Sequence, residues 1–320
     1  MSTCASASRD HDEPLSATAA TATTWLLLEQ PGPWGAKALT SSHLDPAVGR
    51  ALERATRDTG VRVALIRRPG RHADRRTPSV RRVYAAHTVP GRVWLRSALT
   101  ADPERLLDLD FAALGRGDHH SFDTVLGGGS HTGDPLALVC TNGKRDRCCA
   151  LLGRPLAAEL AASGGEGVWE VTHLGGHRFS PTLLVLPYGY AYGRAEAHAV
   201  KDVLHAVREG RVVVEGCRGR TAWERPAQAA ELAVRAATGE DGADALTVVR
   251  TEPAVVRCEE SAPRWEVTVA HADGRRWQVS VAQGASLPPG PESCGVSVLG
   301  TPGRMDVVAV RELTAVRLAG

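Results

Sequence analysis

The sequence predicts an α/β protein, in which a compact central unit is flanked by an amino-terminal α/β half and a small carboxy-terminal α+β module. Short apolar runs alternate with segments of helical period, a glycine-rich stretch interrupts this pattern near residue 127, and the pattern changes again after residue 210. The chain has 320 residues, 43% of them hydrophobic and 23% charged. This composition is ordinary for folded globular domains, and the length allows more than one of them.

The first 22 residues are predicted to form a disordered tail, because Ser, Thr, Ala and charged residues dominate them. An amino-terminal α/β region is expected over residues 23–126, and it begins with the apolar run 25–29. The remaining elements expected in this region are a helix over 46–57, strands over 61–66, 82–87 and 92–95, and a helix over 103–114.

The central unit is expected over residues 135–210, after the glycine-rich stretch 127–135. A buried strand over 136–140 precedes a segment of helical period over 149–162. Strands over 168–172 and 183–186, a Tyr-rich turn and a helix over 194–209 complete it. An order of β-α-β-β-(β)-α within about 75 residues is what a thioredoxin-like layer requires.

The carboxy-terminal module, residues 211–320, has no motif that indicates its role. An alanine-rich helix is expected to end near residue 238, and strands are expected over 246–256, 264–270, 276–281 and 305–310. The sequence therefore predicts a small α+β module of unknown role.

Charge and cysteine usage narrow the classes of function. The formal net charge is only +2, which gives no electrostatic case for a nucleic acid or a membrane as partner. The seven cysteines are an odd number, and no secretory signal precedes them. We therefore expect a cytoplasmic protein with reduced thiols, which would suit a metal centre.

Cysteines and histidines gather within the central unit. Cys140 ends the first strand of that unit, Cys148 and Cys149 follow after a short loop, and His173 and His177 come just after a later strand. Thiolate sulfur and imidazole nitrogen are the ligands that hold zinc or an iron–sulfur cluster, and four of them suffice for either. From the residues alone, Cys140 can pair with Cys148 or with Cys149.

The spacing favours a [2Fe–2S] cluster and leaves zinc as the alternative. Histidines of zinc fingers usually share a helix face, whereas Gly175 and Gly176 between His173 and His177 favour a turn. Structural zinc also prefers a shorter separation between its cysteines than the one from Cys140 to Cys149. Two neutral imidazoles in place of two thiolates would make an oxidised cluster easier to reduce.

The run VCTNGKRDRCCALLGRPL, followed by VWEVTHLGGHRFSPTLLVLPYGYAYGR, resembles the sucrase/ferredoxin-like family of thioredoxin-like ferredoxins. The opening WLLLEQPGPWGAK resembles the amino-terminal half of that family. The resemblance implies a non-Rieske [2Fe–2S] cluster with two histidine ligands, and its Arg-Asp-x-x-Cys pattern selects Cys149 over Cys148. The ligands that it implies are Cys140, Cys149, His173 and His177.

The function that we expect is electron transfer rather than stand-alone catalysis, with a redox partner such as a flavoprotein reductase. The alternatives are a zinc-stabilised binding module that uses the same four ligands, and a reductase that depends on the cluster or on the thiols of Cys148 and Cys149. We also expect an internal ion pair between Arg145 and Asp146. The basic side chains expected around the mouth of the site are Lys144, Arg145, Arg147, Arg178 and Arg194.

Overall fold

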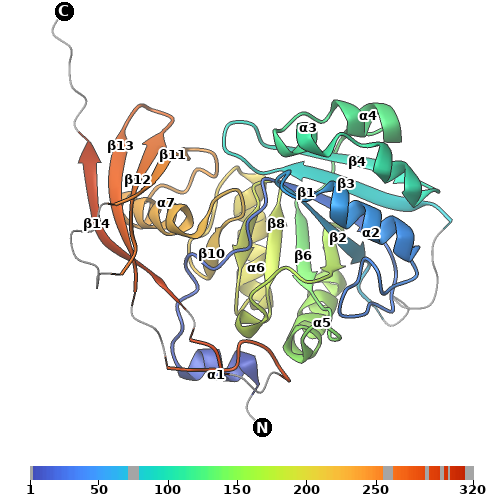
Figure 1. Cartoon of the computed structure of the whole chain (residues 1–320), viewed down its shortest axis with the longest axis horizontal. Helices are drawn as coiled ribbons and strands as arrows, with labels where there is room; N and C mark the ends of the chain where they lie inside the picture. Colours follow the sequence, from blue (N-terminus) through green and yellow to red (C-terminus); the bar gives the residue numbers. More distant parts are fainter. Residues whose placement is uncertain are drawn as a thin grey trace, which may run out of the picture.

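A ten-stranded mixed sheet forms the centre of the protein, and a four-stranded antiparallel sheet lies to one side of it (Figure 1). The prediction of an α/β class is thus confirmed. The computed structural model describes residues 3–70, 79–254, 262–284, 288–295, 299–301 and 303–313. No helix in these ranges is long and apolar enough to cross a membrane.

The amino-terminal half of the large sheet has the strand order β2-β1-β3-β4. β1 and β2 are parallel, while β3 is antiparallel to β1 and to β4. β1 is an apolar run that is buried along almost its whole length, as expected for a central strand. The elements are β1 (Thr24–Glu29), α2 (Pro46–Ala55), β2 (Val61–Arg67), β3 (Arg81–His87) and β4 (Trp94–Thr100).

The helix expected over 103–114 is wrong as a single element. The chain forms the 3-10 helix η1 (Pro103–Asp108), becomes extended at Leu109, and begins α3 (Phe111–Gly115) with a new cap from Asp110. Asp102 and Asp110 each accept a hydrogen bond from the first turn that follows them, so each starts its own helix. The helix α4 (His120–Leu126) and the short strand β5 (Gly129–Ser130) complete this half.

The central unit has the predicted β-α-β-β-β-α order, and its strands are arranged as β7-β6-β8-β9. Its elements are β6 (Leu136–Cys140), α5 (Arg147–Ala162), β7 (Val168–Val171), the 3-10 helix η2 (His177–Phe179), β8 (Leu183–Leu186), β9 (Tyr190–Tyr192) and α6 (Ala197–Arg208). β6 is parallel to β7 and antiparallel to β8, as β1 is to β2 and β3. The two halves of the sheet therefore repeat one topology, which no repeat in the sequence indicates.

The two halves join where β2 and β7 run antiparallel at their carboxyl ends. The register places Ile66 opposite Val171 and Arg67 opposite Glu170. The loops that follow β1 and β6 therefore meet, and the Asn142 side-chain amide donates to the carbonyl of Gly35 over 3.1 Å.

A buried ion pair fills this junction. Arg67 lies 2.7 Å from Glu170 through Nη2 and donates to the same carboxylate through Nε over 2.8 Å. Thr141 also donates to Glu170, and the Arg67 guanidinium stacks on Trp34 at 4.1 Å. Since buried charges are tolerated only when they are paired and hydrogen-bonded, these contacts fix the position of the loop that begins beside Cys140.

The second sheet has the order β11-β12-β13-β14, and α7 (Arg225–Thr238) packs against it. The four strands are β11 (Leu246–Pro253), β12 (Arg264–His271), β13 (Arg276–Gln283) and β14 (Met305–Leu313). β10 (Cys217–Arg220) pairs with β9 and belongs to the large sheet, although we expected the separate module to start at residue 211. A helix and four strands were expected here, and they are present among the described residues, although residues 255 and 256 of the strand expected over 246–256 lie outside them.

The expectation of a disordered tail is wrong for residues 3–22. α1 (Cys4–Asp10) is capped by Thr3, and Cys4, Ala5 and Ser8 on it are buried. Farther along, the backbone N–H groups of Thr18 and Ala22 donate to carbonyls of Arg218 and Thr221. Short side chains cannot build a core of their own, but they allow this segment to lie closely against a surface formed by other elements. Figure 1 shows α1 at the lower edge of the molecule, next to an orange-red segment from late in the chain.

Candidate metal centre

Two cysteines meet because β6 ends where α5 begins its first turn. Cys140 is the last residue of β6, and Cys149 lies in the first turn of α5. Asp146 caps α5 by accepting a hydrogen bond from the N–H of Cys148 over 2.8 Å. Gly153 lets the helix approach the strand, because a side chain there would collide with the carbonyl oxygen of Cys140.

The four residues predicted as ligands gather at one place, which we call the cysteine–histidine site: Cys140, Cys149, His173 and His177. Cys140 and Cys149 belong to one buried cluster of side chains, and Cys149 and His173 both lie near enough to Cys140 to lower the pKa of its thiol. The rings of His173 and His177 lie 5.2 Å apart. Gly175 and Gly176 have φ of +88° and +69°, so the histidines flank a turn as the glycines indicate.

The pKa values of the two thiols of this site are shifted in opposite directions. The neighbouring thiol of Cys149, together with His173 and the backbone of Leu174, holds the pKa of Cys140 well below its usual range. The neighbouring thiol of Cys140 and burial raise the pKa of Cys149. Burial also lowers the pKa of His177, which favours its neutral form. A thiolate and a neutral imidazole are the forms in which these side chains bind metals.

Each histidine keeps one buried nitrogen without a partner. Nδ1 of His173 and Nδ1 of His177 are both buried, and neither has a hydrogen-bond partner. Nε2 of His177 lies 3.7 Å from a carboxylate oxygen of Asp146, and a proton held on that side of the ring leaves the Nδ1 lone pair free. Two sulfurs and two unpartnered imidazole nitrogens form a donor set that fits a [2Fe–2S] cluster or zinc.

Cys148 faces a second group, although it is adjacent to Cys149. This group, the three-cysteine site, consists of Cys4, Asp146, Cys148 and Cys294, whose ligand atoms all lie within 4.8 Å of one another. It could hold a metal ion. Successive helix residues point in different directions, so two adjacent cysteines serve two different places. Sequence reasoning missed Cys4 and Cys294 because no local spacing connects them to Cys148.

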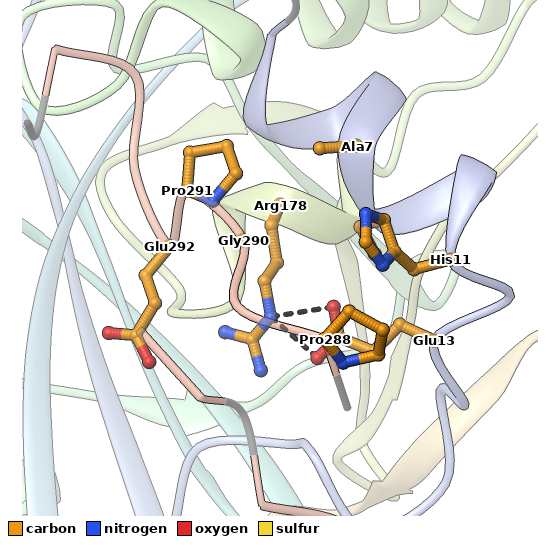
Figure 2. Close-up of a pocket in the computed structure, with 9 residues that line it drawn as sticks. Ala7, His11, Glu13, Arg178, Pro288, Gly290, Pro291 and Glu292 are labelled. Atoms are coloured by element: carbon orange, nitrogen blue, oxygen red, sulfur yellow. Dashed lines mark hydrogen bonds and ion pairs between the residues drawn. The ribbon is translucent and has the colours of Figure 1, made fainter. Parts of the chain in front are cut away.

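Two of the five basic residues expected around the mouth of the site hold other parts of the chain. Arg178 donates to both carboxylate oxygens of Glu13 over 2.7 and 2.9 Å, and Arg194 donates to the backbone carbonyls of Ser8 and Glu13. Figure 2 shows Arg178 between Glu292 on one side and Glu13 on the other. The side chains that remain exposed are Lys144, Arg145 and Arg147.

The ion pair expected between Arg145 and Asp146 is not formed. The Asp146 carboxylate turns inward, where it accepts from the N–H groups of Cys148 and Cys294 and from the hydroxyl of Ser293. Arg145 is exposed. The role of Asp146 is therefore to cap α5 and to hold the segment around Cys294.

A comparison with models of protein families finds a match over residues 15–219, described as sucrase/ferredoxin-like. The chain belongs to the sucrase/ferredoxin-like family. The matched range holds both halves of the large sheet and all four residues of the cysteine–histidine site. No curated protein and no solved structure matches the chain. Cys4 and Cys294 both lie outside the family match.

Proposed function

We propose that this member of the sucrase/ferredoxin-like family is an electron-transfer protein that holds a [2Fe–2S] cluster through Cys140, Cys149, His173 and His177. The observation that carries the proposal is the proximity of two buried cysteines of one cluster to two imidazoles whose buried Nδ1 atoms have no partner. When bound, such a cluster accepts and returns one electron.

The cysteines of the site are buried, whereas one of its histidines is partly exposed to solvent. Cys140 and Cys149 are 1% and 0% exposed, whereas the side chain of His177 is 14% exposed. The thiols are thus shielded from water and oxidants, and the histidine loop reaches the surface. We place the route of the electron at the histidine loop for this reason.

The backbone and a carboxylate hold the ligands in their reactive forms. The nearby backbone of Leu174 lowers the pKa of Cys140 and so favours its thiolate. Nε2 of His177 lies 3.7 Å from the Asp146 carboxylate, and this negative charge favours the tautomer that keeps Nδ1 free. Exposed Lys144, Arg145 and Arg147 supply a positive surface at the start of α5, suited to an acidic redox partner such as a flavoprotein reductase.

Two adjacent cysteines provide a matched test. Cys149→Ser is expected to abolish the visible absorption and the bound iron of anaerobically purified protein, because it removes a proposed ligand. Cys148→Ser is the same change one residue away, and it is expected to leave both in place. Iron and sulfide assays, with bleaching by dithionite, check this result. Iron-free wild-type protein that cannot be reconstituted, or a Cys149→Ser variant that keeps its colour, contradicts the proposal.

A histidine ligand can be tested by its effect on the potential. His177→Cys is expected to keep the colour and to lower the reduction potential, because it replaces a neutral ligand by a negatively charged thiolate. Clusters of the plant type, which have four cysteine ligands, lie near about −400 mV, below clusters with two histidine ligands. The wild-type potential is expected to vary with pH, since an exposed imidazole can lose its remaining proton in the oxidised state. A potential that is flat from about pH 6 to pH 10 would argue against histidine ligation.

A further inference from the structure

The second group of cysteines has the dimensions of a mononuclear metal site. Its three sulfurs are separated by 3.2 Å (Cys148 to Cys294), 3.5 Å (Cys4 to Cys148) and 3.5 Å (Cys4 to Cys294). Both carboxylate oxygens of Asp146 lie 3.6 Å from the sulfur of Cys4. At Zn–S distances of ~2.3 Å and Zn–O distances of ~2.0 Å, tetrahedral ligands lie about 3.8 Å (S to S) and 3.5 Å (S to O) apart.

We propose that Cys4, Cys148, Cys294 and Asp146 bind one zinc ion, at a site separate from the cysteine–histidine site. Three thiolates and one carboxylate are a complete tetrahedral set for zinc, and thiolates exclude the hard cations magnesium and calcium. A polynuclear cluster would place its inorganic core between these sulfurs, whereas here all three are in contact. The geometry therefore fits a single ion.

A disulfide explains the three sulfurs less well. All three cysteines are free, and each sulfur pair is much farther apart than the ~2.05 Å of a disulfide bond. Any one disulfide would also leave the third thiol in place, next to the carboxylate. A single metal ion satisfies all four groups at once.

The site joins two segments that are far apart in the chain to the start of α5. Cys4 lies on α1, a helix of seven residues, which is too short to be stable alone in water and is held by contacts with the rest of the protein. Cys294 lies between β13 and β14, where its N–H group donates to Asp146, and only Cys148 and Asp146 belong to the core of the fold. Metal binding that orders such segments contributes its free energy to folding. The zinc ion thus fastens both outer parts of the chain to the start of α5.

The first experiment is a metal assay on the anaerobically purified full-length chain and its variants. Wild-type protein is expected to carry zinc in addition to iron. Cys4→Ser and Cys294→Ser are each expected to lower zinc from about one atom per chain to below about a tenth, with iron unchanged. Cys217→Ser changes another buried cysteine, on β10 and outside the group, and is expected to keep both metals.

A cobalt titration of zinc-depleted protein provides a readout that does not depend on zinc contamination. Co²⁺ bound by three thiolates gives intense charge-transfer bands and tetrahedral d–d bands, which Cys294→Ser should weaken strongly. Absence of these bands, or a stoichiometric disulfide between Cys148 and Cys294 in freshly prepared protein, overturns the proposal.

The same assay separates this proposal from the proposed function. If zinc is lost in Cys149→Ser but kept in Cys294→Ser, the ion occupies the cysteine–histidine site, and both the second site and the [2Fe–2S] assignment are wrong. If zinc depends on Cys4 and Cys294 while no iron or sulfide is found, the zinc site stands and only the electron-transfer function fails.

Discussion

Protonation of the buried His87 is expected to destabilise the protein in mild acid. His87 is 1% exposed, and its Nδ1 lies 2.8 Å from the hydroxyl of Thr24. That hydroxyl donates to the carbonyl of Leu114, so it accepts from Nδ1–H. Nε2 is buried without a partner. Burial, with Arg92 and Arg220 nearby, lowers the pKa of His87 to about 4.

The sign and size of the effect follow from the two pKa values. An unfolded histidine has a pKa near 6.5. Between about pH 6.5 and pH 4, His87 is therefore protonated in the unfolded chain and neutral in the folded protein. The stability that His87 contributes is complete above pH 6.5 and is lost as the pH falls toward 4. From about pH 7.5 to 4.5, a shift from 6.5 to 4 lowers the free energy of unfolding by about 2.5 kcal/mol.

Urea unfolding of wild-type protein and His87→Gln at these two pH values isolates this contribution, since acid effects common to both proteins cancel in the difference. Glutamine can donate to Thr24 and carries no titrating group. The free energy of unfolding of wild type minus that of His87→Gln should be about 2.5 kcal/mol smaller at the lower pH than at the higher pH. His198→Gln, at a side chain that is 77% exposed, is the control and should follow wild type. An equal gap for His87→Gln at both pH values would refute the reasoning.

Two further predictions concern the contacts that position Cys140. Gly153→Ala is expected to destabilise the protein by about 1–3 kcal/mol and to lower its iron content, because the added methyl group pushes α5 away from the carbonyl of Cys140. Gly49→Ala creates a similar collision in α2 and should destabilise without changing the iron content of the folded protein. Arg67→Met is expected to lower the free energy of urea unfolding by about 3–5 kcal/mol, because Glu170 is left buried without its cation. Arg67→Met with Glu170→Gln should recover much of the loss, and a loss below about 1 kcal/mol in the single variant would contradict the interpretation.

The sequence predicts much of the central unit because its elements are local and buried. Apolar runs such as 136–140 and 183–186 coincide closely with strands, and the helical period of 149–162 lies within α5. The predicted cysteine–histidine site uses the same pattern, since Cys140 ends a strand, Cys149 lies in the first turn of a helix, and His173 follows a strand. The choice of Cys149 over Cys148 rests on the family resemblance and stays a prediction, while Cys148 faces Cys4 and Cys294.

Features that depend on distant parts of the chain are not visible in the sequence. The antiparallel junction of β2 and β7 needs only two residue pairs, and no periodicity indicates it. The three-cysteine site draws on Cys4 and Cys294, which are separated from Cys148 by 144 and 146 residues. The composition of residues 3–22 indicates disorder because the segment has few large apolar side chains with which to form a core of its own. Composition carries no information about the surface of the other elements, on which this segment packs.

The outer segments influence the proposed ligand set without being part of it. Glu13 holds Arg178 on the loop that carries His177, and the backbone of Glu292 lies close enough to the His177 ring to influence its pKa. Both residues lie outside the family match, as do Cys4 and Cys294. A zinc ion at the three-cysteine site would fix the segment that carries Glu292, only two residues before Cys294. The chain outside the matched range therefore contacts the loop that carries His177, while all four proposed ligands lie within the family match.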